Sequence, residues 1–378
     1  MIGGMTRHDE LPLAHTRPGT RRVLPVHRFG RPGARPKVYI QAGLHADETP
    51  GLLVARHLID RLAGLDADGA VRGEVVVVPV ANPIGMDQHL LGVRVGRFEL
   101  ATGVNFNRDY PDLAPAVADA VRGRLGADVS GNVDLVRAAL ADAVAALPTR
   151  TEGDSLRKAL LSLAVDADVV LDLHCDSDAL MHLYTLPSLW DGFADLAARL
   201  GCAAVFLAEV SGGEPFDEAC SGVWPRLRAL LPAEVPLPDA CAATTIELRG
   251  YYAVDDAQGA ADAAAVLDHL RVRGVIAGEA PPAPPACAPT PLAGLDRIDA
   301  PVAGVVLFHV GLGDHVAAGR TVAEVLDPFT GVRHPCVART DGLVWTRQHT
   351  RQVNAGDKVV VVAGAAPLPG KGAKLLTA

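Results

Sequence analysis

Two histidines and one carboxylate stand where two apolar runs of the sequence end. His45 and Glu48 lie three residues apart in the segment GLHADE, and His174 ends the run VVLDLH. This is a typical ligand set for a catalytic zinc ion, which keeps a fourth position open for water. We therefore predict that one zinc ion per chain binds to His45, Glu48 and His174. Asp172, two residues before His174, is a candidate to orient the imidazole of that ligand, or else a structural aspartate.

Glu247 lies within the apolar segment TTIELRG. Burying a carboxylate in a strand costs free energy unless the group is paired or used in chemistry. Beside an activated water, such a carboxylate can accept a proton and pass it to the leaving amine. We interpret Glu247 as this catalytic base; the alternative is a buried ion pair with Arg249.

A second polar cluster is the segment RFELATGVNFNRDYP, in which Asn107 and Arg108 are adjacent. Arginine can hold a carboxylate through two parallel hydrogen bonds, and a neighbouring amide adds a neutral donor. The pair suggests a substrate that carries an acidic group, although an ordinary turn with a solvated arginine is the alternative. Arg97, in preference to Arg94, is a candidate to polarise the scissile carbonyl and stabilise its oxyanion.

Three polar residues follow the third metal-ligand candidate. Cys175 invites comparison with catalytic thiols, but strand alternation points it to the face opposite His174, so we do not expect a nucleophile. Asp176 and Asp178 can line the polar rim of a pocket or cap the next segment.

Short β-branched runs alternate with helical stretches, which predicts an α/β fold: a mixed sheet with helices on both faces. The expected strands are apolar throughout, as in strands that are buried on both faces. They cover 38–43, 75–80, 168–174, 203–208 and 243–249. A helix is expected at 50–63, because Thr49 can cap it and Pro50 suits its first position. Residues 112–164 read as a helical excursion.

The sequence predicts three regions. Residues 1–278 would form the catalytic domain, and the proline-rich segment 279–294 would be an extended linker. Residues 295–378 are rich in glycine and valine and predict a small β domain. Within that domain GLGDHV and NAGDKV repeat the pattern Gly-Asp-x-Val, which suggests a sheet folded back with two-fold symmetry.

Composition excludes several classes of protein. Apolar residues make up 49% of the 378 residues and charged residues 21%, which indicates a globular chain. The net charge is −9 and there is no basic run, so nucleic acid is not expected as a partner. Six cysteines without C-x-x-C spacing favour a reducing compartment, and we predict the cytoplasm. There is no apolar run of membrane-spanning length, so no membrane partner is expected.

Four motifs in a fixed order resemble the succinylglutamate desuccinylase/aspartoacylase family of the zinc carboxypeptidase clan. They are G-x-H-x-x-E at 43–48, N-x-N-R at 105–108, D-L-H at 172–174 and I-E-L-R at 246–249, and the resemblance spans roughly residues 35–275. The resemblance implies a zinc-carboxypeptidase-like fold and the same zinc ligands. It also implies Glu247 as general base, Asn107 and Arg108 as the clamp for a substrate carboxylate, and Arg97 as the residue that polarises the carbonyl.

The C-terminal region resembles the small β domain of this family and, more distantly, the barrel-sandwich domains that carry biotin or lipoate. Those carriers present a lysine at a hairpin, whereas the corresponding segment DPFTGVRHP contains none. A swinging cofactor is therefore not expected. The domain would instead pack over the mouth of the active site or mediate oligomerisation.

These features together predict a zinc-dependent hydrolase that deacylates an N-acyl amino acid or a similar carboxylate-bearing amide. Its partner would be that small molecule; an ester substrate and assembly into a homo-oligomer are left open. The alternatives are a metallocarboxypeptidase that trims peptides and a zinc-binding relative without catalysis. The presence of Glu247 disfavours the last, because a binding protein gains little from a carboxylate aimed at activated water.

Overall fold

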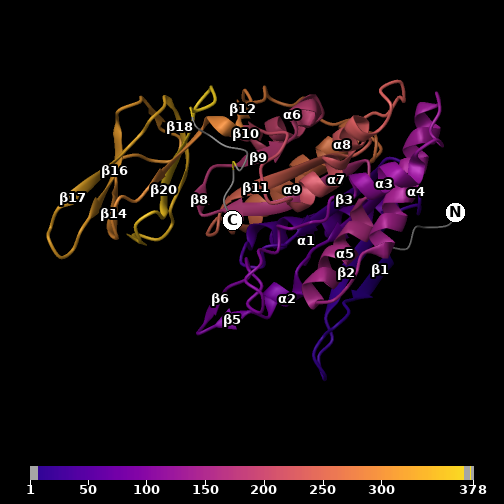
Figure 1. Cartoon of the computed structure of the whole chain (residues 1–378), viewed down its shortest axis with the longest axis horizontal. Coiled ribbons are helices and arrows are strands. Elements are labelled where there is room, and N and C mark those ends of the chain that lie inside the picture. Colours follow the sequence, from indigo (N-terminus) through magenta and orange to yellow (C-terminus); the bar gives the residue numbers. More distant parts are fainter. Residues whose placement is uncertain (1–6, 370–374, 376–378) are drawn as a thin grey trace.

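The computed structural model describes residues 7–369 and residue 375, and its largest feature is a mixed sheet (Figure 1). The strand order in this nine-stranded sheet is β1-β2-β4-β3-β7-β11-β9-β10-β12. Its parallel centre consists of β3 (Lys37–Ala42), β4 (Glu74–Val78), β7 (Val169–Asp176) and β11 (Ala242–Gly250). All four correspond to expected strands, and residues on both of their faces are buried.

Further strands flank this centre. They are β1 (Arg7–Pro12), β2 (Val23–Gly30), β9 (His182–Thr185), β10 (Ala204–Leu207) and β12 (Thr290–Pro291). The pairs β1/β2, β2/β4 and β9/β11 are antiparallel, which makes the sheet mixed. We predicted β10 but not β1, β2 or β9. β1 is a mostly exposed edge strand of polar sequence, so it lacks the apolar run that marks the central strands.

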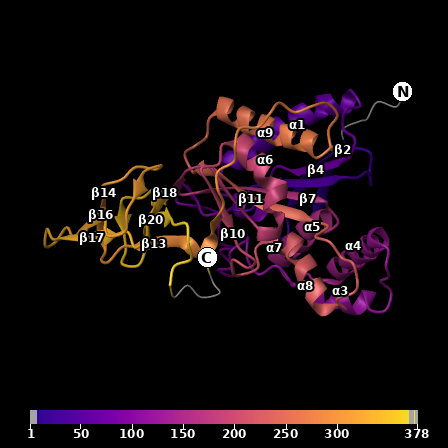
Figure 2. The same cartoon turned by 90° about the horizontal axis from the view of Figure 1, so that it is seen from above.

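Helices cover both faces of the sheet, as expected (Figure 2). One face carries α1 (Pro50–Ala67), α6 (Trp190–Leu200) and α9 (Asp256–Val272). The other carries α3 (Ala114–Val121), α4 (Val129–Ala146), α5 (Glu152–Ala164), α7 (Phe216–Ser221) and α8 (Val223–Leu230). The α1 helix begins where predicted and runs four residues beyond residue 63. Short elements between these are α2 (Pro83–Met86), β5 (His89–Leu90), β6 (Val93–Arg94), β8 (Asp178–Ala179) and a 3₁₀ turn (Pro187–Leu189).

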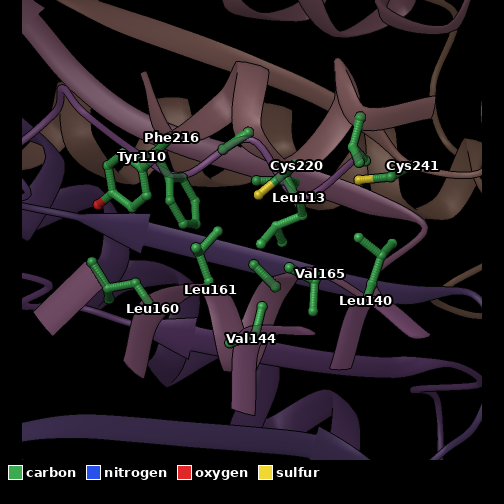
Figure 3. Close-up of a cluster of buried hydrophobic side chains, with 14 of the residues drawn as sticks. Tyr110, Leu113, Leu140, Val144, Leu160, Leu161, Val165, Phe216, Cys220 and Cys241 are labelled. Carbon is green, nitrogen blue, oxygen red and sulfur yellow. The ribbon is translucent and has the colours of Figure 1, made fainter. Parts of the chain in front are cut away.

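The helical segment 112–164 is part of the main core. Figure 3 shows apolar side chains of α4 and α5 meeting those of the α3 and α7 region above the sheet. The labelled members of this cluster are Tyr110, Leu113, Leu140, Val144, Leu160, Leu161, Val165, Phe216, Cys220 and Cys241. The burial of these apolar side chains stabilises the packing of α7 on the strands that carry the candidate ligands.

The C-terminal β region forms two facing sheets around a valine-rich core (Figure 1). One has the order β13 (Leu295–Asp299), β20 (Lys358–Ala363), β18 (Gly342–Arg347) and β15 (His315–Val316). The other has the order β17 (Arg333–Val337), β16 (Thr321–Leu326), β14 (Gly304–Phe308) and β19 (Gln352–Val353).

The two Gly-Asp-x-Val segments adopt the same turn. Asp314 accepts a hydrogen bond from the N–H of Gly311 at 2.9 Å, and Asp357 accepts one from Asn354 at 2.7 Å. Each aspartate thus closes a turn onto the residue three positions earlier, ahead of a strand. This shared geometry explains the repeat in the sequence.

The C-terminal β region attaches to the main sheet just beyond the end of β7. Strand β8 pairs with β18, so Asp178 lies opposite Arg347, and their side chains form an ion pair of 2.7 Å. Lys358 at the start of β20 pairs with Asp176 at 2.9 Å. These aspartates lie two and four residues after His174, so the attachment places the β region beside the candidate metal ligands.

The segment 279–294 between the two regions contains little regular secondary structure. Residues 279–289 contain no helix or strand, Thr290–Pro291 pair with β10, and Leu292–Gly294 form a 3₁₀ turn. The division into a catalytic domain, linker and C-terminal domain stays a prediction. Across residues 7–369 and residue 375, no helix is long and apolar enough to cross a membrane.

Candidate active site

His45, Glu48 and His174 converge at the carboxyl end of the parallel strands. The Nδ1 atom of His45 lies 2.8 Å from Glu48 Oε1, and the Nδ1 atom of His174 lies 2.8 Å from Glu48 Oε2. All three side chains are buried, and one donor atom from each lies within 4.8 Å of the others. Among the described residues, this is the group of histidine, cysteine and carboxylate side chains that can hold a metal ion.

The outer nitrogen of each imidazole is also engaged. His45 Nε2 lies 2.8 Å from Asn105 Oδ1, and His174 Nε2 lies 3.0 Å from Asp172 Oδ2. Gln41 donates to the other oxygen of Asp172 at 3.0 Å, which fixes that carboxylate. With both outer nitrogens held, the Nδ1 lone pairs are directed to one point, as in metal sites whose imidazoles are oriented by outer partners. The predicted contact of Asp172 is present, whereas the sequence analysis missed Asn105, although it opens the N-x-N-R motif.

Glu48 carries the negative charge of this group, between two imidazoles of different basicity. Burial, together with the nearby Arg97, lowers the pKa of His45 to about 4, so its imidazole is neutral. Burial opposes ionisation of Glu48, but the two imidazoles outweigh it and hold the pKa of its carboxyl below the usual range. Burial likewise opposes charge on His174, yet Asp172 and Glu48 raise its pKa. The ligand set therefore fits zinc, whose binding replaces the protons shared between Glu48 and the imidazoles.

Glu247 stands beside this group on β11, paired in register with His174 on β7. Its Oε2 atom is buried and has no hydrogen-bond partner in the described part of the chain. Burial and the charge of Glu48 raise the pKa of Glu247 to about 8, and a bound dication would lower it. Such an unpartnered carboxylate at the metal ligands can accept a proton from water.

The alternative interpretation of Glu247, an ion pair with Arg249, is wrong. Arg249 instead pairs with Asp262 of α9, at 2.8 and 3.1 Å. The ladder between β11 and β7 shifts after Glu247, and Arg249 has a positive φ of 67°. This irregularity breaks the alternation that would have placed both side chains on one face.

Arg97 reaches the candidate metal ligands from the loop after β6. Its Nη1 atom lies 3.2 Å from Glu48 Oε1 and 3.2 Å from His45 Nδ1. The preceding residue, Gly96, packs so tightly that a Cβ would lie 2.6 Å from the Cβ of Ala46. This close approach brings the loop against the metal-binding segment. Arg94 points elsewhere, towards the sulfur of Met86 at 3.6 Å.

Asn107 and Arg108 lie in the same site but differ in the hydrogen bonds that they form with the rest of the protein. The Oδ1 atom of Asn107 accepts a hydrogen bond from the N–H of Phe216 at 2.9 Å, so only its Nδ2 group can serve a substrate. Arg108 donates to the backbone oxygen of Asn107 at 2.7 Å and forms no ion pair with any described carboxylate. Burial and the proximity of Arg97 lower the pKa of Arg108. A half-buried guanidinium without an ion-pair partner among the described residues suits an anionic ligand.

A cavity of about 580 Å³ borders the candidate site and also receives side chains from the C-terminal β region. From that region Trp345, Gln348 and Lys358 line it, and from the site it is lined by His45, Arg97, Asn107, Arg108, His174 and Glu247. The C-terminal β region therefore forms part of the wall of the candidate active site. This agrees with the first of the two roles expected for it.

The residues that follow His174 help to form the wall of this cavity. Cys175 lines the cavity, but burial raises the pKa of its thiol, which disfavours a thiolate nucleophile. Burial opposes ionisation of Asp176, but Lys358 outweighs it and holds the pKa of that carboxyl below the usual range. Asp176 therefore contributes to the rim of the cavity as one half of an ion pair.

Part of the chain matches the model of a known family, and solved structures resemble the whole of it. Residues 34–120 match the succinylglutamate desuccinylase/aspartoacylase catalytic domain. A candidate member of this family from Shewanella amazonensis SB2B shares 28% identity, with 94% of this chain and 98% of that chain covered and a TM-score of 0.84. Another from Shewanella frigidimarina NCIMB 400 shares 25% identity, with coverage of 95% and 97% and a TM-score of 0.83. The chain is therefore similar to the succinylglutamate desuccinylase/aspartoacylase catalytic domain over residues 34–120, and to solved structures named for that family over nearly its whole length.

More distant structures of this family share its fold. A succinylglutamate desuccinylase/aspartoacylase from Rhodobacter sphaeroides has 19% identity, covers 96% of both chains and gives a TM-score of 0.67. No curated protein matches the chain. The matched domain contains His45, Glu48, Arg97, Asn107 and Arg108, whereas His174 and Glu247 lie beyond it and reach the same site through β7 and β11.

Proposed function

We propose that this protein is a member of the succinylglutamate desuccinylase/aspartoacylase family and a zinc-dependent hydrolase that deacylates N-acyl amino acids or similar carboxylate-bearing amides. The observation that carries the proposal is the convergence of His45, Glu48 and His174 beside the unpartnered carboxylate of Glu247. A metal triad alone also fits a binding protein. A free carboxylate at the same point is the feature that hydrolysis needs. The cytoplasmic location and a homo-oligomeric state remain predictions.

His45, Glu48 and His174 would hold the zinc ion, and zinc in such a site activates water and polarises a carbonyl oxygen. Glu247 would take the proton of the attacking water and deliver it to the nitrogen of the leaving amine. Arg97, at 3.2 Å from Glu48, lies close enough to the ligands to donate to the oxyanion that develops on the carbonyl. The low exposure of the ligands excludes bulk water and strengthens these interactions.

Arg108 supports the assignment of an acidic substrate. Its guanidinium is half-buried and forms no ion pair with a described carboxylate, so a substrate carboxylate would supply a counter-ion, with the Nδ2 group of Asn107 beside it. The walls that Trp345 and Lys358 add to the cavity favour a small molecule over an extended peptide. We therefore place deacylation ahead of peptide trimming.

The proposal is tested by incubating the purified protein with zinc and a panel of acetylated, succinylated and aspartyl amino acids, with short peptides in parallel. Hydrolysis is followed by release of the free amine. Turnover of an N-acyl amino acid in preference to peptides supports the proposal. Preference for peptides would favour a carboxypeptidase, and a lack of turnover in the presence of bound zinc would favour a non-catalytic relative.

Replacing Arg108 should weaken binding of substrates according to their charge. We expect Arg108→Ala to raise KM for a substrate with a free carboxylate by the equivalent of about 2–3 kcal/mol, because it removes a charge-assisted contact remote from the scissile carbon. The carboxamide analogue of that substrate cannot form the contact and should lose much less. Equal losses for both compounds would show that Arg108 supports the fold or acts on the carbonyl.

A further inference from the structure

A second buried carboxylate lines the cavity away from the metal ligands. Asp217, on α7, has a relative exposure of 8% and borders the same space as Glu247 and Arg108. Thr245, which lies two residues before Glu247 on β11 and so on the same face, also lines the cavity and hydrogen-bonds to Asp217. Asp217 therefore faces a part of the pocket that continues from the catalytic carboxylate along β11.

The position of Asp217 is set by its neighbour Phe216. That ring is fully buried in the cluster of Figure 3, with its centroid 5.3 Å from that of Tyr110. The backbone of Phe216 is tied to Asn107, and Asp109 donates from its N–H to the oxygen of Gly213 at 2.9 Å. The segment that carries Arg108 and the helix that carries Asp217 are thus held together. Their opposite charges enter one cavity at a fixed spacing.

Asp217 has no cationic ion-pair partner among residues 7–369 and residue 375. Its Oδ1 atom accepts a hydrogen bond from the N–H of Glu218 at 3.0 Å, and Thr245 supplies a further one. No lysine, arginine or histidine in the described part of the chain forms an ion pair with Asp217 within 4.0 Å. Arg108 is near enough to sense its charge but lies beyond that limit. Burial of a carboxylate without a counter-ion costs free energy, and a ligand cation would recover it.

The pKa of Asp217 agrees with a carboxylate that has no ion-pair partner among the described residues. Burial, with the nearby charge of Glu218, raises the pKa of Asp217 to about 7. An ammonium group brought beside it would favour the ionised form and form a charge-assisted hydrogen bond.

We propose that Asp217 is a specificity-determining residue that binds a cationic side chain of the substrate, so that the enzyme prefers N-acyl derivatives of diamino acids. The inference rests on the proposed deacylase function and refines it. The carboxylate of such a substrate would pair with Arg108 while its side-chain ammonium pairs with Asp217. An amino acid with a neutral side chain would leave the Asp217 carboxylate buried and unpaired, and would bind less well.

Binding of product amino acids tests this without turnover. Isothermal titration of the zinc-loaded protein is carried out with L-lysine and its neutral counterpart L-norleucine, and with L-ornithine and L-norvaline. The wild-type protein should bind the better diamino acid about 10- to 100-fold more tightly than its neutral counterpart, the range of a hydrogen bond to a charged group. Equal affinity, or preference for the neutral amino acids, would overturn the proposal even without a variant.

Asp217→Asn should abolish most of this preference while leaving affinity for the neutral amino acid within about threefold, a change of less than 1 kcal/mol. Glu218→Gln is the matched control, because Glu218 is the adjacent acid on α7 and its Oε1 is already held by the N–H of Ser211 at 2.7 Å. If Glu218→Gln reduces the preference as much as Asp217→Asn, the general negative potential and not Asp217 selects the cation, and the assignment fails.

The two proposals fail in different ways. Hydrolysis of neutral N-acyl amino acids, without any preference for lysine or ornithine, would overturn the role of Asp217 and leave the deacylase intact. Selective binding of lysine or ornithine without hydrolysis of any acyl derivative would overturn the deacylase and leave the cation site.

Discussion

Glu247→Gln should retain zinc but lose about 10²-fold or more in kcat, the scale of removing a positioned general base. Glutamine keeps the shape of the side chain and cannot accept the proton. KM should change little, because Glu247 acts on the attacking water and the leaving group and makes no contact assigned to the substrate carboxylate. The measurements are steady-state kinetics on the best substrate of the panel and zinc content of the same preparation.

Glu324→Gln is a suitable control for this variant, since Glu324 lies on β16 and pairs with Arg333 away from the cavity. It should keep wild-type kcat. Near-normal turnover of Glu247→Gln would mean that Glu247 is structural and that another group accepts the proton.

His45→Ala should lose both zinc and activity. The wild-type protein should contain about one zinc ion per chain, because two histidines and one carboxylate form one open tetrahedral site. Removing one ligand also leaves Asn105 without the imidazole that it orients, so the remaining donors are held less well. Metal analysis after dialysis should show zinc well below one per chain, with turnover reduced in parallel.

The fold should survive this loss. The strands that carry the ligands are packed between two apolar clusters that do not include the ligand side chains, so circular dichroism of His45→Ala should stay close to wild type. His57→Ala, on α1 and paired with Asp256, is the matched control and should keep its zinc. Full zinc occupancy in His45→Ala would contradict the ligand assignment.

The sequence by itself determined the central architecture and brought together the three candidate metal ligands. The runs at β3, β7 and β11 are apolar on both faces, so their strand character is local and does not depend on what packs against them. Because parallel strands end at one edge, the polar residues after them had to meet there. His45, Glu48 and His174 therefore followed from residue type and strand ends.

Edge strands carried no such signal. Strand β1 is polar and exposed, and it is a strand because β2 offers it unpaired backbone groups. The ion pair between Arg249 and Asp262 could not be predicted from the sequence either. It depends on a register shift after Glu247, and strand alternation does not predict such a shift.

Only the tertiary structure decided which charges are compensated. Arg108 and Asp217 are more than one hundred residues apart in the chain, and whether either has an ion-pair partner depends on how the loop before α7 packs against the segment 107–110. The wall formed by Trp345 and Lys358 likewise depends on the pairing of β8 with β18. Ion pairing and cavity shape arise from contacts between distant segments, and local sequence patterns do not predict those contacts.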